Sequence, residues 1–358
     1  MGRGGVGQRI IEFAKEALGF LPGGLGFVVF GASMLFGGIS GSAIADSAAI
    51  GSVMVPNMAK QGYSKAFAGG LVAAAGTIGI IIPPSIPLLI YGFVGNVSVA
   101  DLFLAGVVPG LIFGILFMAV CYYVGKTTSC DPGGRRTSRK ALWRAFVRSF
   151  PALLMPVIIL GGIFGGFVTP TEAAAVAVVY GFFVTVVLYR DFSLRDMPKL
   201  IIDSFVTSAI VMVVIGATTV LGWLITLEQL PQILAEFINS ISSSPFTFLL
   251  LVNLVLLLLG LVLDPVPAIL LTAPLFIPTA MTFGVDPVHL GIIMTCNVAV
   301  GLFTPPVGAT LYVASRISGV GVLTIARAMA PLYLAAIFAL MLVTYIPAIS
   351  MTLVEAFR

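Results

Sequence analysis

Oxygen-bearing side chains gather around two proline pairs, in a pattern that would suit a dehydrated cation. Pro83 and Pro84 interrupt an apolar segment at 76–87, GTIGIIIPPSIP. Because proline lacks an N–H and clashes with the carbonyl four residues earlier, this pair frees the carbonyls of Gly79 and Ile80. Free carbonyls in hydrocarbon are costly unless compensated, and hydroxyl, carbonyl and carboxylate oxygens suit sodium. The nearby side-chain donors are Ser40, Ser42, Asp46, Thr77 and Ser85.

A second proline pair, Pro305 and Pro306, lies within NVAVGLFTPPVG at 297–308 and frees the carbonyls of Gly301 and Leu302. The donors near this pair are Asp264, Thr272, Asn297 and Thr304. We expect sodium and substrate to bind in these two regions, each of which faces a hairpin with a buried aspartate. The expected sodium ligands are Ser42, Asp46 and Gly79 in the first region and Asp264, Asn297 and Gly301 in the second. Two alternatives remain open, namely proline kinks that serve packing alone and aspartates that cap hairpin tips.

The composition places these residues in a membrane. Of 358 residues, 59% are hydrophobic and 9% are charged, against about a quarter charged in soluble domains. Uncharged runs such as 17–45, 66–100, 102–125 and 237–263 exceed the length needed to span a bilayer. These runs lack the alternation of a transmembrane barrel, so we predict an all-α polytopic membrane protein.

An internal repeat organises the chain, because 38–109 aligns without a gap onto 260–331 at an offset of 222. Eight glycine or proline positions coincide, including Gly79 with Gly301 and Pro83 with Pro305. Five predicted crossings separate the copies, and an odd number inverts the second copy. The sequence therefore predicts an inverted repeat with two broken helices and two re-entrant hairpins, at 37–51 and 259–274.

Positive charges set the expected orientation. Seven of the 18 lysines and arginines lie in or beside the 126–148 loop, which we expect to be cytoplasmic. We interpret this loop as a topology determinant rather than a nucleic-acid or lipid site. No signal peptide is visible, and Cys121, Cys130 and Cys296 have no metal-binding spacing. The expected domains are 1–21, a cytoplasmic-side amphipathic helix; 22–110, the first repeat; 111–245, the scaffold and connecting spans; 246–331, the second repeat; and 332–358, a C-terminal span.

Four motifs resemble one transporter family, and together they cover nearly the whole chain. They are GGISGSAIADSAAIGSVMVP (37–56), GTIGIIIPPSIPLLIYG (76–92), GGFVTPTEAAAVA (165–177) and NVAVGLFTPPVGATLY (297–312). They are similar to motifs of the large membrane subunit of tripartite ATP-independent periplasmic (TRAP) transporters, the DctM-like permeases. The resemblance implies an elevator-type importer of small organic anions, such as C4-dicarboxylates, in the bacterial inner membrane, with sodium as coupling ion.

The resemblance also implies partners and site residues. The partners are a small four-helix membrane subunit and a periplasmic solute-binding protein. If the family's site residues are carried over to the matching positions of this chain, two sodium regions result. One would contain Ser40, Ser42, Asp46, Gly79 and Pro83, and the other Asp264, Asn297, Gly301 and Thr304. Family members usually carry further spans before the point where this chain starts. Thr169, Pro170, Thr171 and Glu172 match a family motif whose role could be structural.

Other functions remain as alternatives. A sodium- or proton-coupled anion symporter without partners could use Asp46 or Asp264. The Gly38–Gly41 string GISG suggests an intramembrane serine protease, but its histidine partner, His289, is expected at the opposite end of the membrane from Ser40. Val120 replaces the first glycine of a phosphate-binding loop, which argues against ATP-driven transport. Because no lysine or arginine lies deep in a predicted span, we expect helix N-termini, hydroxyls and sodium to hold the anion.

Overall fold

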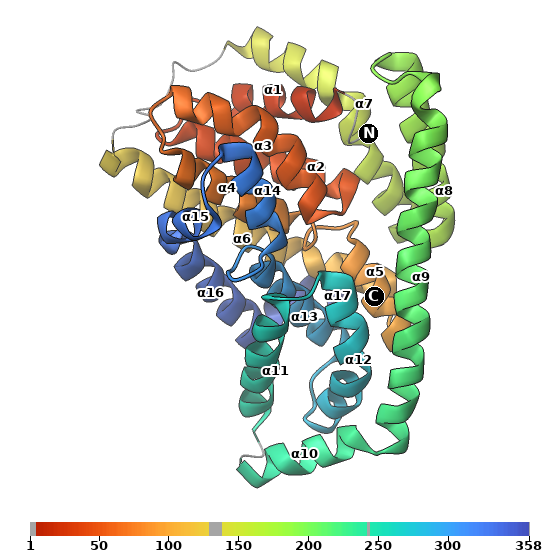
Figure 1. Ribbon diagram of the computed structural model, residues 1–358. Coiled ribbons are helices and arrows are strands. Elements are labelled where there is room, and N and C mark those ends of the chain that lie inside the picture. Colours follow the sequence, from red (N-terminus) through yellow and green to blue (C-terminus); the bar gives the residue numbers. More distant parts are fainter. Residues whose placement is uncertain (1–4, 129–137, 242–243, 358) are drawn as a thin grey trace.

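The fold consists of packed helices (Figure 1). The computed structural model describes residues 5–128, 138–241 and 244–357, and within these ranges it contains 17 α-helices and no strand. In the described part of the chain, five helices are long and apolar enough to cross a membrane, or up to eight spans if each bent helix pair counts as one. The prediction of a polytopic helical membrane protein is confirmed at this level.

The first half of the chain forms a helical hairpin followed by a broken helix. The hairpin helices α2 and α3 meet at Gly41, whose φ of 60° suits glycine, and at Ser42, which caps α3. The break between α4 and α5 spans Gly79–Ser85 because the two prolines there supply no N–H. The helices are α2 (Gly24–Ser40), α3 (Ala43–Lys60), α4 (Lys65–Ile78), α5 (Ile86–Gly95) and α6 (Val99–Thr128).

The second half repeats this order of elements. Shifting the starts of α2 to α6 by 222 residues gives the starts of α11 to α15 to within one residue. The bounds of α3 shifted by 222 coincide with those of α12 at both ends. The helices are α11 (Pro245–Gly260), α12 (Pro265–Thr282), α13 (Pro287–Leu302), α14 (Ala309–Ser318), α15 (Val322–Ala328), α16 (Ala330–Tyr345) and α17 (Ala348–Phe357).

Long helices between the two halves stand along one side of the molecule (Figure 1). The 31-residue α9 packs against α10 and α12, yet only Thr218 and Ile225 are buried along it. Such an apolar, uncovered surface suits contact with lipid or with another membrane protein. The elements are α7 (Arg139–Phe164), α8 (Pro170–Phe182), the π-helical η1 (Phe183–Leu188), the 3₁₀ turn η2 (Leu194–Asp196), α9 (Met197–Leu227) and α10 (Leu230–Ile241).

The core lies where the two broken helices cross. Every residue of α13 from Val288 to Leu302 is buried, as is α4 from Phe67 to Ile78. The amphipathic helix α1 (Val6–Leu18) packs across α2 and α7, and it buries Val6, Ile10, Ile11 and Ala14. In Figure 1, α1 lies at one end of the molecule and α10 at the other.

A few residues used in the sequence analysis fall outside this description. Arg135, Arg136 and Cys130 lie in the loop between α6 and α7 that is outside the described ranges. Cys121 and Cys296 are buried and are not joined in a disulfide.

Candidate functional site

Asp46 lies at the centre of the first candidate site. It occupies the first turn of α3 and is fully buried. The Ser40 hydroxyl donates a hydrogen bond to its Oδ1, and the Ser42 amide donates to the Ser40 hydroxyl at 3.1 Å. Its second oxygen, Oδ2, has no hydrogen-bond partner in the described part of the protein. A buried polar atom of this kind is unusual and indicates a place for a further ligand.

The hairpin tip lies directly against the break in the α4–α5 segment. A Cβ atom built on Gly79 would lie 2.0 Å from Asp46 Oδ2 and 2.9 Å from the Cα of Gly37. Only glycine permits so close an approach of the backbone to the carboxylate. The structure therefore brings together Ser40, Asp46 and Gly79, three of the residues selected from the sequence.

The carbonyls at the first break differ in their hydrogen bonding. The Ile80 carbonyl accepts a hydrogen bond from the Ser85 hydroxyl, so the expectation that it is free is wrong. The Thr77 hydroxyl donates to Ala74 O at 2.7 Å, within its own helix. The Pro83–Pro84 peptide bond is cis. Of the two carbonyls that the prolines release, that of Gly79 remains the candidate cation ligand.

A small cavity lies beside this site. It has a volume of about 150 Å³ and lies between the hairpin tip, the start of α5 and α6. Two of its lining residues, Ser40 and Ser85, carry hydroxyls, while Ile86, Leu89 and Phe103 provide apolar surface. Ser85 is also the N-cap of α5. The Leu88 amide donates to its hydroxyl at 3.4 Å and Pro87 has no N–H, which leaves the Ile86 amide at this wall. The Ser40 and Ser85 hydroxyls donate their protons to Asp46 and to Ile80 O, so the group at this wall that suits an anion is the N-terminus of α5.

The second region is built differently from the first. Asp264 is the N-cap residue of α12, but its side chain is exposed and makes no capping hydrogen bond. The expectation of a buried aspartate in both hairpins is therefore wrong for Asp264. Under the offset of 222 Asp264 corresponds to Ser42, whereas Asp46 corresponds to Ala268. The two aspartates are thus not equivalent, and the difference in burial follows from their different places on the hairpins.

Asn297 instead provides the buried polar group of the second region. It is fully buried, and its Nδ2 donates to Asn253 Oδ1 at 2.6 Å and to Ile293 O at 2.8 Å. Its Oδ1 has no hydrogen-bond partner within the ranges described. Asn297 therefore resembles Asp46 in having one satisfied and one unsatisfied side-chain atom.

Sequence reasoning missed two members of this region. Asn253 on α11 is buried, and its Nδ2 donates to Thr344 Oγ1 on α16 at 3.2 Å. The only sequence signal for Asn253 is that a lone asparagine interrupts the apolar run 245–260. Thr344 lies 91 residues away from Asn253, so their contact depends on the tertiary fold.

The other predicted residues of the second region keep their polar groups close to their own backbone. Thr272 donates to Ala268 O and Thr304 to Val300 O, both at 2.7 Å. The expectation of free carbonyls at the second break is wrong, because Leu302 O accepts a hydrogen bond from the Thr310 hydroxyl at 2.9 Å and Gly301 O accepts one from the Thr304 amide at 3.0 Å. A Cβ atom on Gly301 would lie 2.5 Å from backbone atoms of Gly260, so the hairpin and the break again meet backbone to backbone.

The 169–172 motif has a structural role in this fold. Thr169 is the N-cap of α8, and its hydroxyl accepts from the Glu172 amide at 3.3 Å. The Glu172 carboxylate accepts in return from the Thr169 amide at 2.8 Å, which completes a capping box. Pro170 occupies the first helical turn, where its missing N–H costs nothing. In the described part of the chain, no hydrogen bond or ion pair connects Thr171 to either candidate site.

The geometry excludes the serine protease alternative. The Ser40 hydroxyl is bonded to Asp46. His289 has its Nδ1 within 2.7 Å of the Ser350 hydroxyl and its Nε2 within 3.2 Å of Thr344 O. Neither residue is therefore available to the other as nucleophile and base. Among the described residues, no group of three or more His, Cys, Asp or Glu side chains could hold a metal ion.

The apolar spans and the buried polar groups at the helix breaks define a multi-pass membrane protein with sites inside its helical core. The family described as the tripartite ATP-independent periplasmic transporter, DctM component, matches residues 1–349. The chain belongs to this family of TRAP transporter large permeases. It is a transporter permease and not an enzyme.

Individual relatives agree with this assignment. The chain is 43% identical to the C4-dicarboxylate TRAP transporter large permease protein DctM of Pseudomonas aeruginosa, across 99% of this chain and 82% of that protein. It is 40% identical to the sialic acid TRAP transporter large permease protein SiaM of Vibrio cholerae, across 100% and 83%. It is 39% identical to the isethionate TRAP transporter permease protein DctMQ of Oleidesulfovibrio alaskensis, across 98% and 55%.

Proposed function

We propose that this chain is the large membrane subunit of a sodium-coupled TRAP importer for a small organic anion in the bacterial inner membrane. A periplasmic binding protein delivers the anion, and the scaffold holds a small four-helix membrane subunit. The observation that carries the sodium part is the buried Asp46 carboxylate, which has one oxygen unpartnered against the backbone of Gly79.

Sodium suits this environment on chemical grounds. A buried carboxylate without a counter-charge is strongly unfavourable, and within the described residues no lysine or arginine is bonded to Asp46. A sodium ion would provide the missing charge and would use oxygen ligands only. Asp46 and the Gly79 carbonyl are the candidate ligands, with Ser40 and Ser42 beside them and Pro83 holding the break open. In the second region the candidate ligand is the unpartnered Asn297 Oδ1. The Gly301 carbonyl lies at the same break but already accepts from the Thr304 amide, and Asp264 and Thr304 lie nearer the surface.

An inverted repeat supports an elevator mechanism. The matched starts of α2–α6 and α11–α15 support a duplication, and the odd number of spans predicted between them supports inversion. The helices α1 and α10, which precede the two hairpins, lie at opposite ends of the molecule in Figure 1. In this mechanism the hairpins and broken helices form a transport domain that slides against α7, α8 and α9.

The substrate follows from the chemistry of the small cavity and from the relatives. The names of the relatives specify C4-dicarboxylate, sialic acid and isethionate, all small organic anions. The 150 Å³ cavity beside Ser40 and Ser85 contains the N-terminus of α5, whose Ile86 amide suits a carboxylate. We propose a C4-dicarboxylate or a related carboxylate.

The test is uptake into liposomes that contain this chain together with its small subunit, with the binding protein added outside. We expect uptake of a C4-dicarboxylate only under an inward sodium gradient. Asp46→Asn should reduce the sodium-driven rate by roughly tenfold or more, because a charged ligand is lost. The matched variant Asp264→Asn, at an exposed position, should lose much less.

Two outcomes would contradict this proposal. Uptake that persists without sodium and follows a pH gradient would favour proton coupling through Asp46. Sodium-driven uptake by this chain without the binding protein and the small subunit would favour a symporter that works alone.

A further inference from the structure

A second, larger cavity shares no lining residue with either candidate site. Its volume is about 600 Å³, and it lies where α1, α7 and the segment after η1 meet. This size falls within the usual range of small-molecule sites. Its polar lining includes Gln8, Arg9, Glu12, Arg148, Tyr189 and Asp191.

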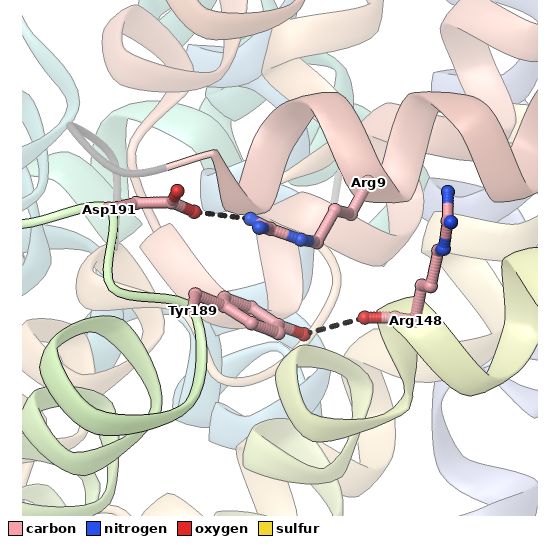
Figure 2. Close-up of polar contacts among 4 residues, drawn as sticks. All are labelled: Arg9, Arg148, Tyr189 and Asp191. Atoms are coloured by element: carbon pink, nitrogen blue, oxygen red, sulfur yellow. Dashed lines mark hydrogen bonds and ion pairs between the residues drawn. The ribbon is translucent and has the colours of Figure 1, made fainter.

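One wall of this cavity is held in place by several contacts (Figure 2). Arg9 forms an ion pair with Asp191, and its guanidinium lies 3.9 Å from the centroid of the Tyr189 ring. The Tyr189 hydroxyl donates to Arg148 O at 2.9 Å. Burial raises the pKa of the Tyr189 phenol above its ordinary value, so the hydroxyl keeps its proton at neutral pH. Because Arg9 and Asp191 form an ion pair, their charges neutralise each other on this wall of the cavity.

Two opposite charges remain on the lining. Glu12 on α1 and Arg148 on α7 are both exposed, and within the described ranges neither belongs to an ion pair. A ligand with only a negative charge would be attracted to Arg148 but repelled by Glu12. A ligand that carries one anionic and one cationic group matches both residues.

The surroundings point to the bilayer as the source of the ligand. Val147, Pro151 and Leu188 add apolar surface to the lining. Trp143, Phe146 and Phe150 form a row of ring contacts along α7, and Trp143 is 66% exposed. Exposed aromatic residues and amphipathic helices such as α1 are typical of the membrane interface.

We propose that this cavity binds the phosphoethanolamine headgroup of a phospholipid, with its phosphate on Arg148 and its ammonium on Glu12. The acyl chains leave along the apolar side of the lining at Val147 and Leu188. Phosphatidylcholine, whose quaternary ammonium has no N–H, would lose the hydrogen bond to Glu12. Phosphatidylglycerol would offer no cation to Glu12 at all.

The test uses purified, delipidated full chain and measures lipid retention by native mass spectrometry and thermal stability after lipid addition. We expect phosphatidylethanolamine to bind more tightly than phosphatidylcholine or phosphatidylglycerol. Glu12→Gln and Arg148→Gln should each weaken this binding by roughly tenfold, as expected for the loss of one charged contact. Glu16→Gln and Arg144→Gln lie one turn away on the same helices, outside the lining, and should bind as the unmodified chain does.

The outcomes separate the possible sources of the headgroup. Soluble O-phosphoethanolamine should compete weakly, because it carries the headgroup without the chains. If it binds as tightly as the lipid, the bilayer is not the source. If Glu12→Gln and Arg148→Gln retain as much phosphatidylethanolamine as the two control variants, or if phosphatidylglycerol binds best, the site does not exist. Melting temperatures without lipid show whether any variant has lost its fold.

Discussion

At the scale of single residues, the first site depends on a carboxylate placed where only glycine fits. The sequence predicts that Asp46 is a buried acidic residue near a helix break and that Gly79 lies at this break, four positions before Pro83. Three further features could be seen only in the folded structure. They are the contact between Asp46 and Gly79, the absence of a partner for Asp46 Oδ2 among the described residues, and the hydrogen bond from Ser85 to the Ile80 carbonyl. The exposure of Asp264 could not be predicted from the sequence either, because the type of a residue does not determine on which side of a hairpin tip its side chain lies.

Replacing Gly79 by alanine tests this packing. The added methyl would lie 2.0 Å from Asp46 Oδ2, so we expect a loss of about 1–3 kcal/mol in stability and a loss of sodium-driven uptake. Gly216→Ala on α9, where nothing lies within 4 Å, should not lower the melting temperature. Equal melting temperatures for both variants in the same detergent would contradict the close contact.

A second prediction at the scale of single residues concerns Asn253. Asn253→Ala should lower stability by about 1–3 kcal/mol, since it removes buried hydrogen-bond partners of Asn297 and Thr344. Thermal unfolding of Asn253→Ala, Thr344→Val and the double variant measures the coupling. The double variant should lose less than the sum of the single losses, because the two residues share a bond. Strict additivity would show that the bond between Asn253 and Thr344 contributes no coupling energy.

At the scale of elements, the breaks follow from proline and glycine chemistry, and this is why sequence reasoning located them. Pro83 and Pro305 supply no N–H, so α4 and α13 end before these prolines however the surrounding helices are arranged. The contact of α1 with the segment after η1 was not predictable, since Arg9 and Asp191 are 182 residues apart. Alternation and spacing report on local structure, whereas such contacts depend on how distant elements pack.

The start of α8 offers a prediction for an element. Thr169→Ala removes one side of the capping box and should lower stability by about 1 kcal/mol. Thr169→Ser keeps the hydroxyl and should restore most of this loss. Melting temperatures measure the effect, and the KM for uptake should not change. A changed KM with an unchanged melting temperature would assign Thr169 to the substrate path instead.

At the scale of the whole molecule, the proposed inversion predicts which side each copy faces. Lys60 and Thr282 are equivalent under the offset of 222, and both are exposed. Cysteines at these positions, in a background with Cys130 replaced by serine, should react with a membrane-impermeant maleimide from opposite sides. Lys60→Cys should be labelled only in inside-out vesicles and Thr282→Cys only in intact spheroplasts. Labelling of both from one side would rule out inversion.

The glycine contacts described above have a further consequence for motion. Gly37 meets Gly79, and Gly260 meets Gly301, so at these points each hairpin touches its broken helix main chain to main chain. Main-chain contacts have no rotamers that can adjust when one partner moves. Each hairpin tip and its break should therefore open as one cooperative unit, and their amide protons should exchange with solvent at a shared rate.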